Sequence, residues 1–311
     1  MNKIDRVAVC SRSFSRNTTL RKELLSKYSN VTFNDAGLIL EDDALVEFLS
    51  GATKAITALE RISEEVLSQL PNLKVIGKYG VGMDMIDMQA MKRHGKYLGW
   101  TGGVNKRSVS EMVVSLIISM LRHLPIAQRN VLDGNWKQHV GGLLSGRTLG
   151  IVGCGFIGKD LIQLLYSWDC KFLAHDIVEF DDFYKRYNVE SVTLTDLLKR
   201  SDIVSLHLPL DETTNKILDA DHLRLMKPDS ILINVARGGL VDETEVKRML
   251  IENCLAAAAF DVFSVEPPED KELLLLDNFF ATPHLGGSTE EAILAMGRAA
   301  IDGLDKNRIP V

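Results

Sequence analysis

Short apolar runs alternate along the chain with stretches in which apolar residues recur every three or four positions. Runs of four or five apolar residues are typical of buried strands, and the wider spacing is typical of amphipathic helices. In the stretch 18–27, for example, Leu20, Leu24 and Leu25 fall on one side of a helix. The N-terminal third predicts strands at 6–10, 31–33, 54–57 and 74–77, with helices at 18–27, 44–49 and 63–70.

The next strong pattern is the stretch 109–124, which is apolar nearly all round. Such a helix must be buried on most faces, by its own domain or by a second subunit, and we expect Pro125 to end it. A last helical pattern covers 289–304. Between them the pattern predicts strands at 148–152, 171–174, 203–206, 231–235 and 257–260, and helices at 159–168, 194–200 and 243–251.

Strands that alternate with helices predict an α/β protein with parallel sheets. A chain of 311 residues suggests two domains, and the last helix is expected to return to the first of them. The predicted fold is α/β with two doubly wound parallel-sheet domains, a Rossmann domain inserted into a flavodoxin-like domain. The predicted domains are 1–102 plus 289–311, and 103–288.

Composition narrows the function classes. A formal net charge of −6 gives no sign of a nucleic-acid or membrane surface, although a local cationic pocket for an anionic substrate is compatible with it. The N-terminus lacks the apolar run of a signal peptide, and 112–121 is too short to span a bilayer. Four scattered cysteines without metal-ligand spacing predict neither disulfides nor zinc and fit a reducing cytoplasm, where we expect the protein: Cys10, Cys154, Cys170 and Cys254.

A glycine-rich turn, GCGFIG, follows the predicted strand 148–152 and opens the next helix. Glycines at these spacings are typical of dinucleotide sites: Gly153 permits the tight turn, Gly155 lets the pyrophosphate approach, and Gly158 allows close helix–strand packing. The helix N-terminus then offers unpaired N–H groups to the phosphates. The alternative, a plain strand-to-helix turn, does not explain three glycines at these positions.

Asp176 closes the next predicted strand, about twenty residues after the turn, where an acid accepts the ribose hydroxyls. A solvated carboxylate at a strand end is the plainer alternative, but the position favours the ribose. A 2′-phosphate would be repelled by Asp176, and no Arg or Lys directly follows it. NAD is therefore favoured over NADP. The inserted domain, 103–288, is thus predicted to be a Rossmann NAD-binding domain, and 1–102 plus 289–311 the substrate domain.

Three later segments carry more chemistry than a scaffold needs. Arg237 follows a buried strand, where it can hold a carboxylate by two hydrogen bonds, although surface ion pairs are the commoner use of arginine. Asp261 follows another strand, and Glu266 precedes a double proline. His284 lies between a proline and two glycines, a loop setting that disfavours a buried core histidine. A histidine can move the proton that accompanies hydride transfer, and a carboxylate on its other nitrogen orients it.

These segments, in this order and over almost the whole chain, resemble the D-isomer-specific 2-hydroxyacid dehydrogenase family, together with 78–84 and 103–111. The resemblance implies a substrate clamp, an orienting acid and an acid/base at Arg237, Glu266 and His284. It implies substrate contacts from the backbone at Gly80, Val81 and Gly82, and a homodimer built around the apolar helix after Gly103. The implied cofactor contacts are Gly153, Gly155, Phe156, Ile157, Gly158, Asp176, Leu208, Pro209, Val235, Ala236, Asp261 and Gly286.

Within the family, 74–87 and the GVNKRSV segment most resemble phosphoglycerate dehydrogenases, here without a regulatory domain because the chain ends at Val311. A phosphate needs cations, and Lys54, Lys78, Lys106 and Arg107 are candidates. The segment 96–102 departs from the family pattern, since it holds Trp100 and no proline. The alternatives are an NAD-sensing scaffold like the family's corepressors, and a dehydrogenase for formate or a phosphorus oxyacid; no metal is expected.

Overall fold

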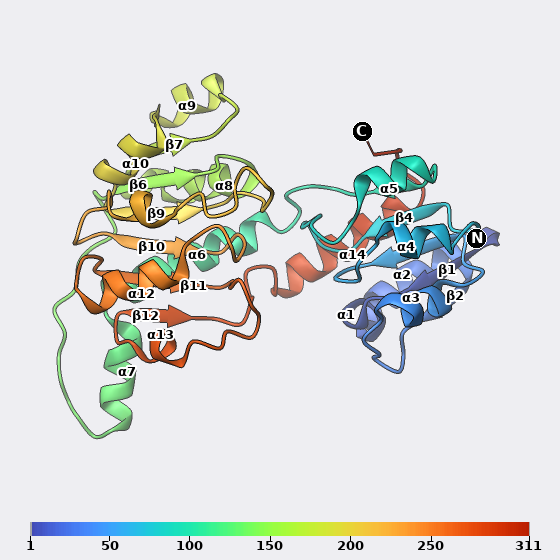
Figure 1. The fold of residues 1–311 in the computed structure, drawn as a ribbon, viewed down its shortest axis with the longest axis horizontal. Coiled ribbons are helices and arrows are strands. Elements are labelled where there is room, and N and C mark those ends of the chain that lie inside the picture. Colours follow the sequence, from blue (N-terminus) through green and yellow to red (C-terminus); the bar gives the residue numbers. More distant parts are fainter. Residues whose placement is uncertain (1, 311) are drawn as a thin grey trace. The chain divides into compact units, whose positions relative to one another are not determined.

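The computed structural model describes residues 2–310 and divides the chain into two compact units. The first unit holds the chain up to Asn105 and again from Glu290, and the second unit is Lys106–Thr289. The predicted boundaries, after residues 102 and 288, lie three residues and one residue before the observed ones. Figure 1 shows the fold of each unit.

The first unit is built on a five-stranded parallel sheet with the order β2-β1-β3-β4-β5. This is the flavodoxin-like order, in which the chain leaves β1 to one side for β2 and to the other for β3. The strands are β1 Asn2–Val9, β2 Tyr28–Phe33, β3 Lys54–Thr57, β4 Val75–Lys78 and β5 Tyr97–Gly99. The helices are α1 Arg12–Arg16, α2 Thr18–Lys27, α3 Asp42–Leu49, α4 Glu64–Ser68, α5 Met88–Arg93 and α14 Glu290–Gly303.

The second unit is built on a seven-stranded parallel sheet with the order β12-β11-β10-β9-β6-β7-β8. From β6 the chain moves outward through β7 and β8, then returns to the other side of β6 at β9, which is the Rossmann arrangement. The strands are β6 Thr148–Val152, β7 Lys171–His175, β8 Val189–Ser191, β9 Ile203–Leu206, β10 Ile231–Asn234, β11 Ala257–Phe260 and β12 Phe279–Ala281. The helices are α6 Lys106–Leu121, α7 Leu124–Leu132, α8 Phe156–Leu165, the 3₁₀ turn Tyr166–Trp168, α9 Asp181–Tyr187, α10 Leu194–Arg200, α11 Ala220–Leu223, α12 Glu243–Ile251 and α13 Lys271–Leu275.

Both faces of this second sheet are covered by helices, because side chains along a strand alternate between faces. In β10, Ile231 and Ile233 pack into the core shared with α6 and α8, whereas Leu232 packs into the core shared with α10 and α12. The inner strands β10 and β11 are therefore mostly apolar rather than alternating, as their sequences predict.

The apolar helix after Gly103 corrects one prediction. Helix α6 ends at Leu121, and His123 adopts a left-handed conformation with φ +54°. Pro125 does not end a helix; it lies in the first turn of the separate helix α7, where its missing N–H leaves no backbone acceptor unsatisfied. Eight residues of α6 are buried within the second unit: Ser108, Val109, Ser110, Val113, Leu116, Ile117, Met120 and Leu121.

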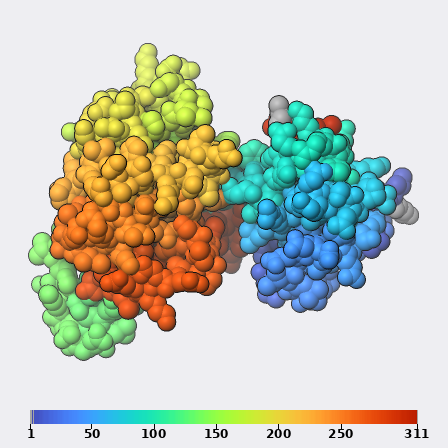
Figure 2. Space-filling view, in the orientation of Figure 1, coloured from blue at the N-terminus to red at the C-terminus, as the bar shows by residue number. Residues whose placement is uncertain are grey.

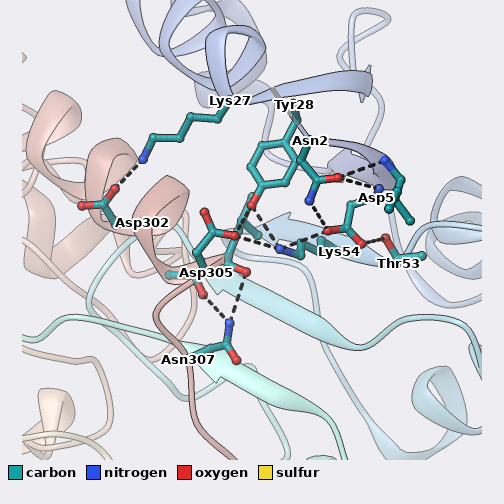
Figure 3. A network of polar contacts seen from close by, with 12 residues as sticks. Asn2, Asp5, Lys27, Tyr28, Thr53, Lys54, Asp302, Asp305 and Asn307 are labelled. Atoms are coloured by element: carbon teal, nitrogen blue, oxygen red, sulfur yellow. Dashed lines mark hydrogen bonds and ion pairs between the residues drawn. The ribbon is translucent and has the colours of Figure 1, made fainter.

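The C-terminal helix α14 belongs to the first unit, and a polar network just beyond its end ties it to the sheet (Figure 3). Lys54 lies at the start of β3 and pairs with Asp305 at 2.9 Å and with Asp5 at 3.3 Å. The Tyr28 hydroxyl also donates to Asp305. Burial opposes the charge on Asp305, but the hydrogen bonds from Tyr28 and Lys54 outweigh it and lower the pKa of that carboxyl. Lys54 therefore lies at the amino edge of the sheet, away from the Gly80 turn that follows the other end of β4, so its assignment as a phosphate partner is wrong.

We expect Lys54→Met to lower the free energy of unfolding by about 1–2 kcal/mol, because two carboxylates lose a charged hydrogen-bond donor in a partly exposed setting. The pKa values of Asp5 and Asp305 are lowered in the fold, so this contribution is present above their usual pKa of 3.8 and is lost as the pH falls below it. Urea unfolding at pH 7 and pH 3 measures both effects. Lys27→Met, which removes an exposed ion pair with Asp302, is the control and should change little.

Candidate functional site

The site in the second unit lies at the carboxyl edge of its parallel sheet. In a doubly wound sheet the carboxyl ends of the strands share one edge, and ligands bind beyond it where the strand order reverses. In this sheet the order reverses between β6 and β9. Six residues with distinctive chemistry follow six strands: Gly153 follows β6, Asp176 β7, His207 β9, Arg237 β10, Asp261 β11 and His284 β12.

The three glycines of the turn differ in how much space a side chain would have. Gly153 has φ +93°, and a Cβ there would come within 2.9 Å of the His207 backbone. A Cβ on Gly158 would come within 2.5 Å of the Gly153 carbonyl oxygen, so helix and strand pack closely. A Cβ on Gly155, by contrast, would meet no atom within 4 Å. The turn is therefore closed on the protein side and open at Gly155, at the N-cap of α8, as a pyrophosphate site requires.

Helix α8 starts directly at this turn, at Phe156, three residues earlier than the sequence pattern predicts. The early start brings the backbone N–H groups of Phe156 and Ile157 into the first helical turn, where they have no intrahelical partner. These are the donors that an N-terminal phosphate site uses. The Phe156 side chain is exposed, and Ile157 packs in part against the core below the turn.

Asp176 is connected to the glycine turn itself. One of its carboxylate oxygens accepts from the Cys154 N–H at 2.7 Å, and the other accepts from the Val178 N–H at 2.9 Å. The Gly153 N–H in turn donates to the His175 carbonyl at 2.9 Å. The acid at the end of β7 is thus held in a fixed orientation beside the predicted phosphate site. A bond to the ribose stays a prediction.

The segment after β9 begins with His207, whose Nε2 lies 2.9 Å from the Ser205 hydroxyl. Burial lowers the pKa of this imidazole to about 3, so His207 is neutral at physiological pH. Its backbone packs against Gly153, and so does the side chain of Leu208, a predicted cofactor residue. A cofactor contact from Pro209 stays a prediction. His207 therefore has a structural role in this edge of the sheet.

Glu266 and His284 form a pair. The Glu266 Oε2 atom lies 3.0 Å from His284 Nδ1, and Oε1 accepts from the Phe263 N–H at 3.1 Å. Both side chains are about half exposed. Because the carboxylate occupies Nδ1, that nitrogen carries the proton and Nε2 is presented on the far side of the ring. Such a pair can give and take a proton at Nε2.

Asp261 positions the loop that carries His284. Its carboxylate is buried and accepts from the Thr282 hydroxyl, the Leu285 N–H and the Gly286 N–H at 2.6, 2.7 and 2.8 Å. The His284 N–H donates to the Asp261 carbonyl at 2.9 Å. The structure thus gives Asp261 and Gly286 a role in holding the loop, and their contact with a cofactor stays a prediction.

A second support of the same loop comes from α6 and was not predicted from the sequence. The Ser108 hydroxyl, in α6, donates to the Gly286 carbonyl at 2.6 Å. Ser110, two residues later, donates to the Ile157 carbonyl at 3.3 Å. These serines lie within the GVNKRSVSE motif, but nothing in the sequence indicates partners 178 and 47 residues away.

Arg237 lies in a short loop that packs against the loop carrying Glu266. Asn234 fixes the Arg237 backbone, since its side chain donates to the Arg237 carbonyl at 2.9 Å and accepts from the Ala236 N–H. A Cβ on Gly238 would come within 1.9 Å of the Phe263 carbonyl carbon, so the two loops are in direct backbone contact. Val235 is buried in the core shared with α6 and α8, and Ala236 in the core shared with α10 and α12.

The predicted substrate turn, Gly80 to Gly82, belongs to the first unit and follows β4. Gly80 has φ +110°, a conformation that residues with a side chain rarely adopt. The Tyr79 N–H donates to the Thr57 carbonyl at 2.8 Å, which fixes the start of the turn. Beneath it, the buried Lys78 ammonium donates to the carbonyls of Ala58 and Tyr79. The turn therefore stands above a buried positive charge.

The cations predicted to bind a phosphate group do not form one cluster with the same partners. Lys54 and Lys78 have the contacts described above. Arg107 makes a bidentate ion pair with the buried Asp160 on α8, at 2.9 and 3.1 Å. Lys106 is exposed at the start of α6. Within residues 2–310 no group of three or more His, Cys, Asp or Glu side chains could hold a metal ion.

Over the same residues no single helix is long and apolar enough to cross a membrane. Helices α6 and α7 reach the required length and composition only together, and they are bent by 62° with respect to each other. Half of α6 is buried in the core of the second unit.

Comparison with known proteins agrees with this geometry. The model of the D-isomer specific 2-hydroxyacid dehydrogenase NAD binding domain matches residues 114–286. The chain is 34% identical over 288 residues to a D-3-phosphoglycerate dehydrogenase of Methanocaldococcus jannaschii, covering 88% of this chain but only 55% of that enzyme. It is 34% identical over 273 residues to a hydroxypyruvate reductase of Thermotoga maritima, covering 86% of this chain and 88% of that enzyme.

Among solved structures, an NAD-binding protein of the same description from Polaromonas sp. JS6 66 superposes with a TM-score of 0.88 at 29% identity, covering 97% of this chain and 96% of that one. The match includes both sheets, and the family model covers the glycine turn and the Glu266–His284 pair. The chain therefore belongs to the D-isomer specific 2-hydroxyacid dehydrogenases, a family of NAD-dependent oxidoreductases.

Proposed function

We propose that the protein interconverts a small D-2-hydroxy acid and its 2-keto acid with NAD(H). The observation that carries this proposal is the Glu266–His284 pair, 3.0 Å apart, at the same sheet edge as the open glycine turn. A scaffold that only senses NAD needs the turn but not an acid–base pair. The nicotinamide, when bound, supplies or accepts the hydride at C2 of the substrate.

The roles of the side chains follow from their chemistry. In reduction, protonated His284 gives the proton on Nε2 to the substrate carbonyl oxygen as that oxygen gains negative charge. Glu266 holds Nδ1 and stabilises the imidazolium that is present before this step. Arg237 is the proposed clamp of the substrate carboxylate, which it can hold with two parallel hydrogen bonds. The N–H groups of the Gly80–Gly82 turn are the further carboxylate donors that we propose. In oxidation the same proton returns to neutral His284.

For the substrate, we favour an unphosphorylated 2-keto acid such as hydroxypyruvate or glyoxylate over phosphohydroxypyruvate. Three of the four cations predicted for a phosphate have partners: Lys54 with Asp305, Lys78 with two carbonyls, and Arg107 with Asp160. A phosphate dianion needs several uncommitted donors to offset its desolvation. The two relatives named above are a D-3-phosphoglycerate dehydrogenase and a hydroxypyruvate reductase, so kcat/KM values for this protein distinguish the two kinds of substrate.

A steady-state assay with NADH and a panel of 2-keto acids tests the proposal. We expect turnover with hydroxypyruvate or glyoxylate, at a kcat/KM at least about tenfold above that for phosphohydroxypyruvate. NADPH should serve poorly, because Asp176 repels a 2′-phosphate. Binding of NADH without turnover of any keto acid would support the scaffold instead.

The second unit also exposes an apolar arm, which we propose to be the contact surface of a homodimer. The arm is α7 and the segment that follows it to Leu143, light green in Figure 2. No residue of α7 is buried, and Leu132, Trp136 and Val140 are 77, 87 and 95% exposed. Large apolar side chains this exposed, gathered on one segment, are rarely left uncovered in a monomer. A second copy of the same chain presents the same arm, and a two-fold axis lets each cover the other.

We expect Leu132→Asp with Val140→Asp to shift the protein from dimer to monomer in light scattering coupled to size-exclusion chromatography. The matched control is Leu59→Asp, an equally exposed leucine in the first unit, which should leave the dimer intact. A wild-type monomer, or a dimer that survives the double substitution, would contradict this assembly.

We also propose that the protein works in the cytoplasm. The four cysteines are all free thiols, two of them buried, which is in keeping with a reducing compartment. Burial, opposed in part by the Tyr184 hydroxyl, raises the pKa of the Cys154 thiol in the glycine turn to about 11, so it is protonated and unreactive there. Cell fractionation would test the location.

A further inference from the structure

Trp100 makes an unusual contact with the predicted substrate turn. It follows β5 directly, and its indole Nε1–H donates to the Val81 carbonyl at 3.0 Å. Both residues belong to the first unit, on neighbouring strands β5 and β4 or just beyond them. The contact therefore links the segment that departs from the family pattern to the middle of the turn.

This hydrogen bond determines more than the position of one carbonyl. The Val81 carbonyl and the Gly82 N–H belong to the same planar, trans peptide group, so they point in opposite directions. When Trp100 holds the carbonyl on its own side, the Gly82 N–H must point to the opposite side. The indole thus fixes the direction of one of the donors assigned above to the substrate carboxylate.

The backbone of the turn needs such an anchor. Val81 lies between two glycines, and glycine adopts many backbone conformations at little cost. The turn is fixed at its start by the Tyr79 N–H on the Thr57 carbonyl, and beyond its end by the Ile86 N–H on the Met83 carbonyl at 3.0 Å. The Trp100 bond holds the peptide between these two points.

The indole is not tightly packed on its other side. It lines a cavity of about 430 Å³ within the first unit, together with Met83, Met88, Leu98, Lys306, Asn307, Arg308 and Pro310. About a third of Trp100 is exposed. A ring bounded by a cavity gains little orientation from packing alone, so its hydrogen bond to Val81 contributes to its orientation.

We propose that Trp100 is a positioning residue, which aims the Gly82 N–H at the substrate carboxylate. The proposal rests on the function proposed above. It assigns Trp100 a role in substrate affinity. Trp100 itself need not touch the substrate.

The test is Trp100→Phe, which keeps an aromatic ring beside the cavity and removes the donor. We expect KM for the best 2-keto acid to rise about five- to tenfold, the effect of one neutral hydrogen bond, with kcat changed less than about twofold. The Kd for NADH should be unchanged, because the glycine turn lies in the other unit. Met88→Ala, which enlarges the same cavity without touching the hydrogen bond, is the matched control and should leave KM unchanged.

A wild-type KM in Trp100→Phe, or the same rise in KM in Met88→Ala, would overturn the positioning role while leaving the proposed function in place. No turnover of any keto acid by the wild-type protein would instead overturn the proposed function, and this role with it. If Trp100→Phe melts at a lower temperature than the wild type, benzothienylalanine placed at position 100 decides the matter. That residue replaces the indole N–H by sulfur at nearly constant shape, and it should raise KM as Trp100→Phe does.

Discussion

Replacing His284 with alanine is expected to lower kcat for keto-acid reduction by about 10²- to 10⁴-fold, the range that a general acid contributes. The substrate oxygen then has to take its proton from water as the hydride arrives. NADH binding should remain, because the glycine turn follows β6 and His284 follows β12. Stopped-flow turnover and a fluorescence titration with NADH measure the two effects separately.

Substitution of Glu266, the partner of His284, should give a smaller effect of the same kind. Glu266→Gln keeps a side chain that can contact Nδ1 but removes the negative charge, so kcat should fall by less than in His284→Ala. The control is His222→Ala on α11, which removes a histidine that also pairs with a carboxylate, Asp219, and should leave kcat unchanged. Full turnover in His284→Ala would show that the acid–base group is some other residue.

The second large effect is expected at Gly155. Gly155→Val places its Cβ where no protein atom lies within 4 Å, so we expect the protein to fold normally. The added methyl groups would occupy the open side of the turn and keep a pyrophosphate from the N–H groups of α8. The loss of one or two hydrogen bonds to a charged group weakens NADH binding about ten- to 100-fold or more.

Gly158→Val is the matching variant, and we expect it to lower stability because its side chain lies on the closed side of the turn. A Cβ at this position would approach the Gly153 carbonyl oxygen to 2.5 Å and an Ile151 methyl group to 2.8 Å, so helix and strand must separate. We therefore expect a clear fall in Tm, by overpacking. Wild-type NADH affinity in Gly155→Val would show that the cofactor phosphates do not lie at this turn.

The fold could be predicted because many of its elements have a clear pattern of apolar residues. Inner strands such as β6, β9 and β10 are mostly apolar, and helices α2 and α12 begin and end at the residues predicted for them. The strands β5 and β8, of three residues each, were not predicted because they have too few positions to show a period. The end of α6 was predicted wrongly from Pro125, because proline is common both in the first turn of a helix and just after its last turn.

For the site, residue types and order along the chain identified Arg237, Glu266 and His284, since parallel strands bring residues at their ends to one edge. The supports of these residues could not be predicted, because they depend on distant contacts. Ser108 on Gly286 and Asp261 on the His284 loop are contacts between residues that carry no pairing signal. Lys54 illustrates the reverse error: only the strand direction shows that it lies at the wrong edge.

The central claim is hydride transfer to C2 of a 2-keto acid, with His284 providing the proton. Its most direct test is reduction of the best 2-keto acid with NADH that carries deuterium at the transferable position, followed by chiral analysis of the product. We predict a D-2-hydroxy acid with deuterium at C2, and loss of this product in His284→Ala. An unlabelled product, an L-2-hydroxy acid, or the same labelled product at the same rate from His284→Ala would contradict the account.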